Sequence, residues 1–174
     1  GYSSAASDVY KRQVSVPSQS GSLTYTGSTQ SPTWAGYDSS KMTIGGTTSG
    51  TNAGSYNATF TPGSNYQWTD GGSAEKAVAW TIGKATGSLS LNKSSISLNV
   101  SKMSDTITVT RPGTGVISAV SSAPSVASVS VSGNVVTVTG KAKGSATVTV
   151  SVAAGTNHTA PASKTCSVTV TLLS

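Results

Sequence analysis

Hydrophobic and polar residues alternate at period two through the second half of the chain. The alternation covers residues 96–100, 107–109, 129–138, 146–152 and 166–172, with Val, Ile or Leu at nearly every other position. Such a pattern sends successive side chains to opposite faces of a strand, one face buried and the other in water. The second half is therefore predicted to consist of short β-strands.

Turn residues separate these strands. Ser132–Asn134 and Gly140–Gly144 carry Gly or Asn, which tolerate the positive φ angles of tight turns. About seven strands at roughly ten-residue spacing predict a Greek-key sandwich.

The first half is less regular. Tyr56, Ala58 and Phe60 share one parity, Val78 to Ile82 repeats the pattern, and 23–27 is predicted to be a strand with a turn. These segments also predict strands.

A break in composition divides the chain near residues 83–87. All ten aromatic residues lie at or before Trp80. Residues 14–86 carry no net charge, whereas 87–174 carry +5. Each segment is long enough for its own small core. We therefore expect an all-β protein of two tandem β-sandwiches, 14–86 and 87–174.

Composition supports this class. Ser and Thr make up about a third of the chain, Val far outnumbers Leu, and only 9% of residues are charged. No apolar run approaches the roughly 18 residues of a transmembrane helix, so membrane insertion is not expected. The regular alternation argues against disorder.

Residues for catalysis or metal binding are scarce. His158 is the only His and is expected in an exposed loop, while Cys166, the only Cys, has the parity of a buried apolar residue. A hydrolytic triad, an internal disulfide and a zinc site of soft ligands are therefore excluded. We expect no enzyme, no cofactor and no metal.

The carboxylates do not change this view. Only Asp70 and Glu75 lie close in sequence, beside Trp68, where a glycosidase pair is one interpretation and a turn through Gly71–Gly72 the favoured one. A calcium site needs several converging oxygens and is not expected.

Three aromatic residues are the candidate ligand contacts. Trp34, Tyr66 and Trp68 could stack on a sugar, or could fill a core that has few large aliphatic residues. The second interpretation is favoured because the first half offers little else to bury.

The basic second half suggests an anionic partner. Its six Lys and Arg residues are dispersed, and it has no aromatic residue for base stacking, so specific nucleic-acid binding is not expected. Weak attraction to anionic envelope polymers or host cell-surface glycans fits better.

The second segment resembles the group 2 bacterial immunoglobulin-like domains. The resemblance lies in SLSLNKSSISLNV, SSAPSVASVSVSGNVVTVTGKAKGSATVTVSV and SKTCSVTVTL. It departs from the family over Arg111 to Val120, where the usual central strand with its Trp before the Ser-Ser pair is absent, so a lighter core is expected there.

The first segment resembles another bacterial immunoglobulin-like repeat, the MBG type. The matching pieces are LTYTGSTQSPTW, GTTSGTNAGSYNATFTPGSNYQW and AVAWTIGKA. Such repeats occur in cell-surface adhesins of Gram-positive bacteria and in tail and other virion proteins of their phages.

The first residues resemble an artefact. Residues 3–13, SSAASDVYKRQ, are similar to the translation of a transposase adapter used in short-read sequencing libraries. This implies a metagenomic fragment in which native sequence starts near Val14, so 1–13 is expected to be disordered and to pack against nothing.

The resemblances together imply that the two β-sandwiches are tandem immunoglobulin-like β-sandwiches, and they imply a role rather than a reaction. We expect a non-enzymatic structural and adhesion segment of a larger phage tail, fibre or bacterial surface protein, located on a virion or cell surface. It would act as a spacer and weak multivalent binder. The alternative is a carbohydrate-binding accessory module of a secreted glycan-degrading enzyme.

Overall fold

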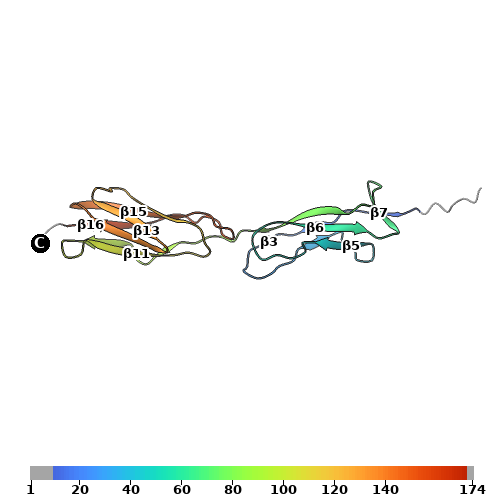
Figure 1. Ribbon diagram of the computed structural model, residues 1–174, viewed down its shortest axis with the longest axis horizontal. Coiled ribbons are helices and arrows are strands. Elements are labelled where there is room, and N and C mark those ends of the chain that lie inside the picture. Colours follow the sequence, from blue (N-terminus) through green and yellow to red (C-terminus); the bar gives the residue numbers. More distant parts are fainter. Residues whose placement is uncertain (1–9, 172–174) are drawn as a thin grey trace, which may run out of the picture. The chain divides into compact units, whose positions relative to one another are not determined.

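The structure, a computed structural model, describes residues 10–171, and this part of the chain contains β-strands and no helix (Figure 1). The prediction of an all-β protein is confirmed. The chain divides into two compact units, unit 1 ending at Gly83 and unit 2 beginning at Lys84. This division lies three residues before the boundary expected from composition, and each unit is described by itself below.

Unit 2 is a sandwich of two four-stranded sheets. One sheet has the order β10-β16-β15-β12 and the other the order β13-β14-β11-β9. The strands are β9 (Ser90–Leu91), β10 (Ser95–Leu98), β11 (Ser104–Thr110), β12 (Ile117–Ser121), β13 (Ala127–Ser132), β14 (Val135–Gly140), β15 (Gly144–Val152) and β16 (Lys164–Val170).

The inward rows of unit 2 follow the predicted parity as far as Val170, and Leu172, the last residue predicted for the final row, lies outside the described part of the chain. Its buried side chains come from both sheets: Leu89, Ile96, Leu98, Ile107, Val109, Ile117, Ala127, Val136, Val138, Ala146, Val148, Val150, Val152, Cys166, Val168 and Val170. The outward positions of β15 and β16 are nearly all Ser and Thr. Alternation of small β-branched residues therefore supplies both the core and the polar surface.

Two details of the predicted rows are wrong. Val100 was expected inside but is 49% exposed, because β10 ends at Leu98 and the backbone turns between Asn99 and Lys102. Val131, near the end of β13, is 37% exposed. Parity indicates which face a residue takes but not where the strand leaves the core.

The expectation that the central strand is absent from residues 111–120 is wrong. β12 covers Ile117–Ser121 and pairs antiparallel with β15. Its inward residues are Ile117, Ala119 and the buried polar Ser121, while Val120 faces outward. Because large apolar residues occur on both faces, period-two alternation was hidden there.

The second strand of unit 2, β10, pairs in parallel with the last, β16, whereas the first, β9, pairs antiparallel with β11 in the other sheet. Ser95 lies opposite Ser167 and Leu98 opposite Val170 in the β10–β16 ladder. Strands that run in the same direction begin at one end of a sheet and finish at the other. The chain therefore enters the sandwich at one end and leaves it at the opposite end.

Unit 1 is built on one four-stranded sheet with the order β3-β8-β6-β5 and two two-stranded sheets, β1-β7 and β2-β4. Its strands are β1 (Arg12–Val14), β2 (Ser18–Ser20), β3 (Leu23–Thr24), β4 (Thr33–Ala35), β5 (Met42–Gly46), β6 (Gly54–Pro62), β7 (Tyr66–Trp68) and β8 (Lys76–Gly83). β3, the third strand, pairs in parallel with the last strand, β8, and β1 pairs in parallel with β7.

Aromatic residues dominate the core of unit 1. The buried members are Val14, Met42, Ala58, Phe60, Trp68, Trp80 and Ile82. Phe60 comes from β6 and Trp80 from β8, which lie side by side in the main sheet. Each unit thus has its own hydrophobic cluster.

The expectation that residues 1–13 pack against nothing is wrong for Arg12 and Gln13. They form β1 with Val14 and pair in parallel with Tyr66–Trp68. Backbone N–H and C=O groups pair regardless of the side chains they carry, so an open edge at β7 can recruit this segment. Tyr10 is 89% exposed, and residues 1–9 lie outside the described part of the chain.

Candidate functional site

The three aromatic residues predicted as ligand contacts join one hydrophobic cluster. Tyr66 and Trp68 share a face of β7, and Trp34 lies in the middle of β4. Trp68 is a buried member of the unit 1 core, and Trp34 and Tyr66 pack against it while half-buried. The structure therefore brings the three together, around a core.

Trp68 is enclosed. Its exposed fraction is 0%, and its indole Nε1 donates a hydrogen bond of 2.7 Å to the Ala74 carbonyl oxygen. The Lys76 Nζ lies 5.9 Å from the ring centroid, within the range of a cation–π contact. A ring held in this way has no free face for a sugar.

Trp34 packs edge-on against Phe60. The ring centroids are 4.9 Å apart with planes inclined by 82°, and the Tyr37 ring is tilted against the same Phe60 at 5.8 Å. Such edge-to-face packing stabilises a core by about 1 kcal/mol beyond burial. Trp34 and Tyr66 keep partial exposure, so within the predicted trio a ligand could reach only these two.

A further aromatic pair was not predicted as a contact. Tyr56 stacks on the buried Trp80 with centroids 4.6 Å apart and planes at 21°, and the Tyr56 hydroxyl donates to the Asn52 carbonyl at 2.5 Å. A Cβ at Gly50 would stand 2.6 Å from the Tyr56 ring, so Gly50 leaves the room that this ring occupies. The alternation in β6 placed Tyr56 on the Trp80 side, but nothing in the sequence indicated the role of Gly50.

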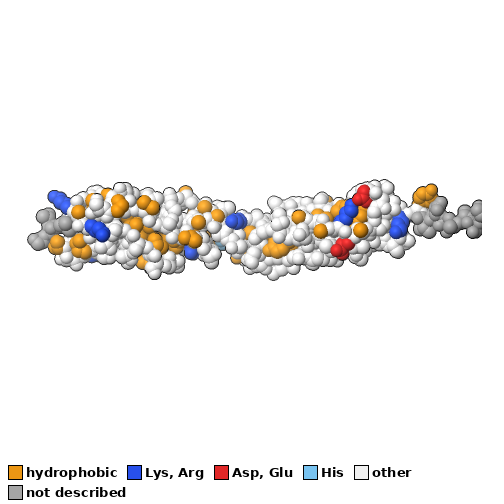
Figure 2. Space-filling view, turned by 45° about the horizontal axis from the view of Figure 1, so that its top comes forward, with side chains coloured by type: hydrophobic (Ala, Val, Ile, Leu, Met, Phe, Trp, Pro, Cys, Tyr) orange, Lys and Arg blue, Asp and Glu red, His pale blue; other side chains and the backbone are white. Residues whose placement is uncertain are grey.

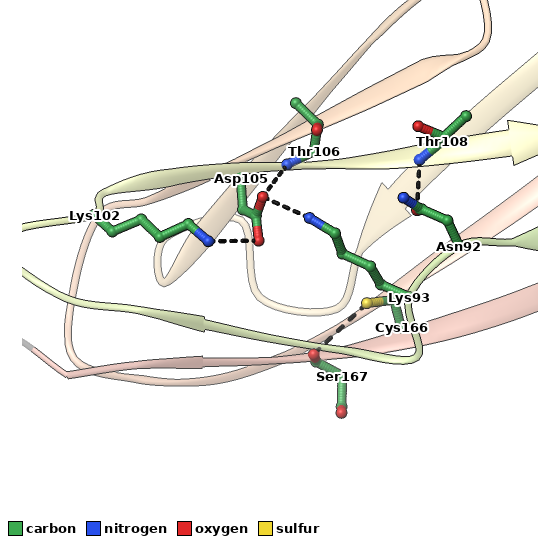
Figure 3. Close-up of polar contacts among 8 residues, drawn as sticks. All are labelled: Asn92, Lys93, Lys102, Asp105, Thr106, Thr108, Cys166 and Ser167. Atoms are coloured by element: carbon green, nitrogen blue, oxygen red, sulfur yellow. Dashed lines mark hydrogen bonds and ion pairs between the residues drawn. The ribbon is translucent and has the colours of Figure 1, made fainter.

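The main charged cluster of unit 2 surrounds Asp105 (Figure 3). Its carboxylate accepts hydrogen bonds from Lys93 Nζ at 2.6 Å, Lys102 Nζ at 3.0 Å and the Thr106 backbone N–H at 2.8 Å. The bond from Lys93, followed by those from Thr106 and Lys102, holds the pKa of Asp105 far below its ordinary value. Through these hydrogen bonds the Asp105 carboxylate links the start of β11 to the segments just before and just after β10.

Cys166 lies in the core near this cluster. Its thiol is fully buried and burial raises its pKa, with only a weak Sγ contact of 3.8 Å to the Ser167 carbonyl. The prediction that Cys166 acts as a small apolar core residue is confirmed.

His158 is half-buried, so the expectation of an exposed loop residue is wrong. Its backbone forms a bridge with Ala85, with Ala85 N bonded to the Asn157 carbonyl and Thr159 N to the Ala85 carbonyl. A Cβ at Gly113 would meet its ring at 2.6 Å. The loop packs into unit 2 because these backbone groups find partners there.

Asp70 forms part of a turn. Its Oδ1 accepts from the Gly72 N–H at 2.8 Å and its Oδ2 from Lys76 Nζ at 2.5 Å. The Lys76 bond, followed by that of Gly72, lowers the pKa of Asp70. These contacts are those of the turn interpretation, and Glu75 is exposed. Within residues 10–171 no three His, Cys, Asp or Glu side chains gather as metal ligands would.

A shallow crevice lies where the chain passes between the sheets of unit 2. Its volume is about 430 Å³, and Leu89, Leu91, Lys93 and Lys164 are among its lining residues. Lys93 is already bound by Asp105. No helix in the described part of the chain could cross a membrane.

Comparisons with known proteins bear on the fold. No protein-family model and no curated protein match this chain. Among solved structures it is similar to domains 4 and 5 of the S-layer protein SbsC, with 15% identity, 91% of this chain and 98% of that chain covered, and a TM-score of 0.41.

Two more structures are similar. SbsC domains 4–9 match with 16% identity and a TM-score of 0.43, over 93% of this chain and 31% of that one, so this chain spans about a third of that structure. The fibronectin(III)-like modules of Clostridium thermocellum CbhA match with 14% identity and a TM-score of 0.38, over 88% and 91% of the two chains.

Proposed function

We propose that this chain is a non-enzymatic spacer and adhesion segment of a larger extracellular protein, on a bacterial surface or a phage virion. The finer family types remain part of the proposal: an MBG-type repeat followed by a group 2 bacterial immunoglobulin-like domain. The observation that carries it is the direction of the chain through each unit.

Parallel pairing suits a spacer. In unit 2 the chain passes through the two-residue β9 into β10 and leaves with β16, which runs parallel to β10; in unit 1 β3, which follows β1 and β2, runs parallel to the last strand, β8. A pull on the two ends of unit 2 acts along β10 and β16 and loads their hydrogen bonds together rather than one at a time. Modules of this topology can be joined in series and resist extension.

The surface supports solubility without strong binding. In Figure 2 most of the visible surface is white, and the Lys, Arg, Asp and Glu side chains are scattered spots. Dispersed lysines give weak, salt-dependent attraction to anionic envelope polymers, and many copies of the protein on one surface would bind such a polymer more tightly than a single copy does. We expect retention on a teichoic-acid or mucin surface at low salt and its loss at about 0.5 M salt, where screening is nearly complete beyond a few ångströms.

The alternative, a carbohydrate-binding accessory module, would need an aromatic platform. Trp68 is buried, so such a platform would rest on Trp34 and Tyr66 alone. Stoichiometric binding of a neutral oligosaccharide on a glycan array, abolished by Trp34→Ala and insensitive to salt, would favour the alternative.

The experiment that tests the spacer is force spectroscopy on the full chain held at its two ends. We expect two separate unfolding events that release at most about 250 and 300 Å of chain. The backbone N–H groups of Ser167 and Thr171 donate to the β10 side of the ladder, so the N–H of Thr169, which lies between them at the same parity, also points at β10. Thr169→Pro removes this N–H and should lower the force of the longer event. Ser97→Pro is the matched control, since the Ser97 N–H points away from β16. Equal forces in all three proteins would contradict the proposal.

A further inference from the structure

β12 is an edge strand whose free side carries unpaired ladder positions. It bonds only β15 within its sheet. The Ala153 N–H donates to Val116 O, and the Ser122 N–H donates to Thr147 O, both at 2.9 Å. Antiparallel ladders alternate, so the backbone groups of Ser118 and Val120 face β15. Those of Ile117, Ala119 and Ser121 consequently face outward from the sheet.

This edge lacks the usual protection. Exposed edge strands are commonly blunted by charge, by Pro or by shortness. Ile117–Ser121 contains no charged residue and no Pro. Two of the other three edges differ: β9 has two residues, and β10 is flanked by the lysines that bind Asp105. The third, β13, also lacks charged residues and Pro, so the outer face distinguishes it from β12.

The outer face of β12 is also apolar. Val116 is 71% exposed and Val120 is 66% exposed, and their parity places both on the outer face. The outward residues of the neighbouring strands are polar: Thr147, Thr149, Ser151, Thr165, Ser167 and Thr169. The outward residues of β13, the other long edge, are Ser128, Ser130 and Ser132. The two most exposed Val side chains of the described part of unit 2 therefore lie on an edge strand, whereas Val131 on the β13 edge is 37% exposed.

We propose that β12 is a self-association edge, where a second copy of this chain pairs antiparallel through its own β12. The strand fits itself about a two-fold axis at Ala119. In that register the two Ala119 residues exchange both backbone hydrogen bonds, and Ile117 faces Ser121 of the second copy. Val120 then covers Ser118 of the second copy on the outer face. No like charges meet, and a small residue lies on the axis.

The product is one continuous eight-stranded sheet across two copies. The contact is short, so it is weak in solution and becomes effective when many copies are held side by side. This lateral contact goes beyond the spacer role and does not depend on it, because it rests on the edge of β12 alone.

Sedimentation equilibrium of the full chain from 10 μM to about 1 mM tests the proposal. We expect a reversible monomer–dimer equilibrium with a Kd of about 0.1–1 mM. Ala119→Pro removes the donor aimed at the free edge, leaves the β15 ladder intact and should raise the Kd at least tenfold. The matched control Ser97→Pro, with its N–H on the free edge of β10, should leave the Kd unchanged. Far-UV circular dichroism verifies that each variant folds.

A charge exchange tests the register. Val120→Lys should weaken the dimer, since it removes an apolar contact and adds two positive charges near the axis. Adding Ser118→Glu to the same chain should restore it, because each new glutamate lies opposite the new lysine of the second copy. A wild-type chain that stays monomeric at 1 mM would overturn the proposal. So would a dimer indifferent to Ala119→Pro, or a double variant no stronger than Val120→Lys.

Discussion

Replacing Trp68 with Ala should destabilise unit 1 and leave unit 2 unchanged. Burying an aromatic ring of this size removes about 200 Å² from water, which at about 25 cal/mol/Å² gives an upper value near 5 kcal/mol. Large-to-small substitutions of buried aromatic residues cost about 3–5 kcal/mol. The lost Nε1 bond also leaves the Ala74 carbonyl without this donor, at about 1 kcal/mol. We expect a loss of about 4 kcal/mol.

The chain provides one probe for each unit. All three Trp residues precede Gly83, so tryptophan fluorescence reports the unfolding of unit 1 alone. The single thiol, Cys166, is buried in unit 2, so its reaction with a thiol reagent reports the opening of unit 2. Urea titrations followed by both probes separate the two free energies of unfolding.

Two control variants separate the contribution of the hydrogen bond from that of the buried ring. Trp68→Phe keeps an aromatic ring but loses the hydrogen bond, and should cost about 1–2 kcal/mol. Trp34→Ala removes a half-exposed ring and should cost less than Trp68→Ala. A loss below 1 kcal/mol for Trp68→Ala would refute the core assignment, and an equal loss in unit 2 would refute the independence of the two units.

Three further predictions concern unit 2. The pKa of Asp105 is lower in the folded than in the unfolded protein, so the stability that Asp105 contributes is present above about pH 4 and is lost as pH falls through the folded pKa. Asp105→Asn should lower the free energy of unfolding by about 1–2 kcal/mol at pH 7 and reduce its fall at acid pH. Urea titrations at several pH values measure both effects. The Cys166 thiol should react only through opening of the unit, at a rate that rises with urea and shows the full free energy of unfolding. Gly115→Ala should cost at least about 2 kcal/mol by the same titration, because its Cβ would stand 2.1 Å from the Ala153 carbonyl oxygen.

Much of unit 2 could be predicted from the sequence because its strands are simple. Small β-branched residues at one parity bury themselves whichever neighbours they meet, so the rows ending at Val152 and Val170 follow from alternation alone. The turn at Ser132–Asn134 predicts the antiparallel pairing of β13 with β14, which is confirmed. The pairing of β10 with β16 could not be predicted, since most of the unit separates the two strands and neither sequence encodes its partner. β12 was missed because Val116 and Val120 break the parity.

Of the two interpretations of Trp34, Tyr66 and Trp68, a sugar-stacking platform or a core, the favoured core interpretation describes the structure only in part. Scarcity of aliphatic residues correctly suggested that Trp68 is core, but it did not distinguish the half-exposed Trp34 from it. Exposure depends on which loops cover a ring, and loops carry no periodic signal. The strand at Arg12–Val14 was missed for a related reason, since its pairing uses backbone groups that every sequence possesses.

The central claim is that the described chain consists of two self-contained β-sandwich units. Residues 10–83 and 84–171 can be produced separately, labelled with ¹⁵N, and their amide spectra compared with that of the full chain. The account predicts two dispersed β spectra whose sum reproduces the spectrum of the full chain except for residues next to the boundary. If either half gave the narrow amide dispersion of an unfolded chain, or if core amides such as Trp80 or Val168 shifted on separation, the two cores would depend on each other and the claim would fail.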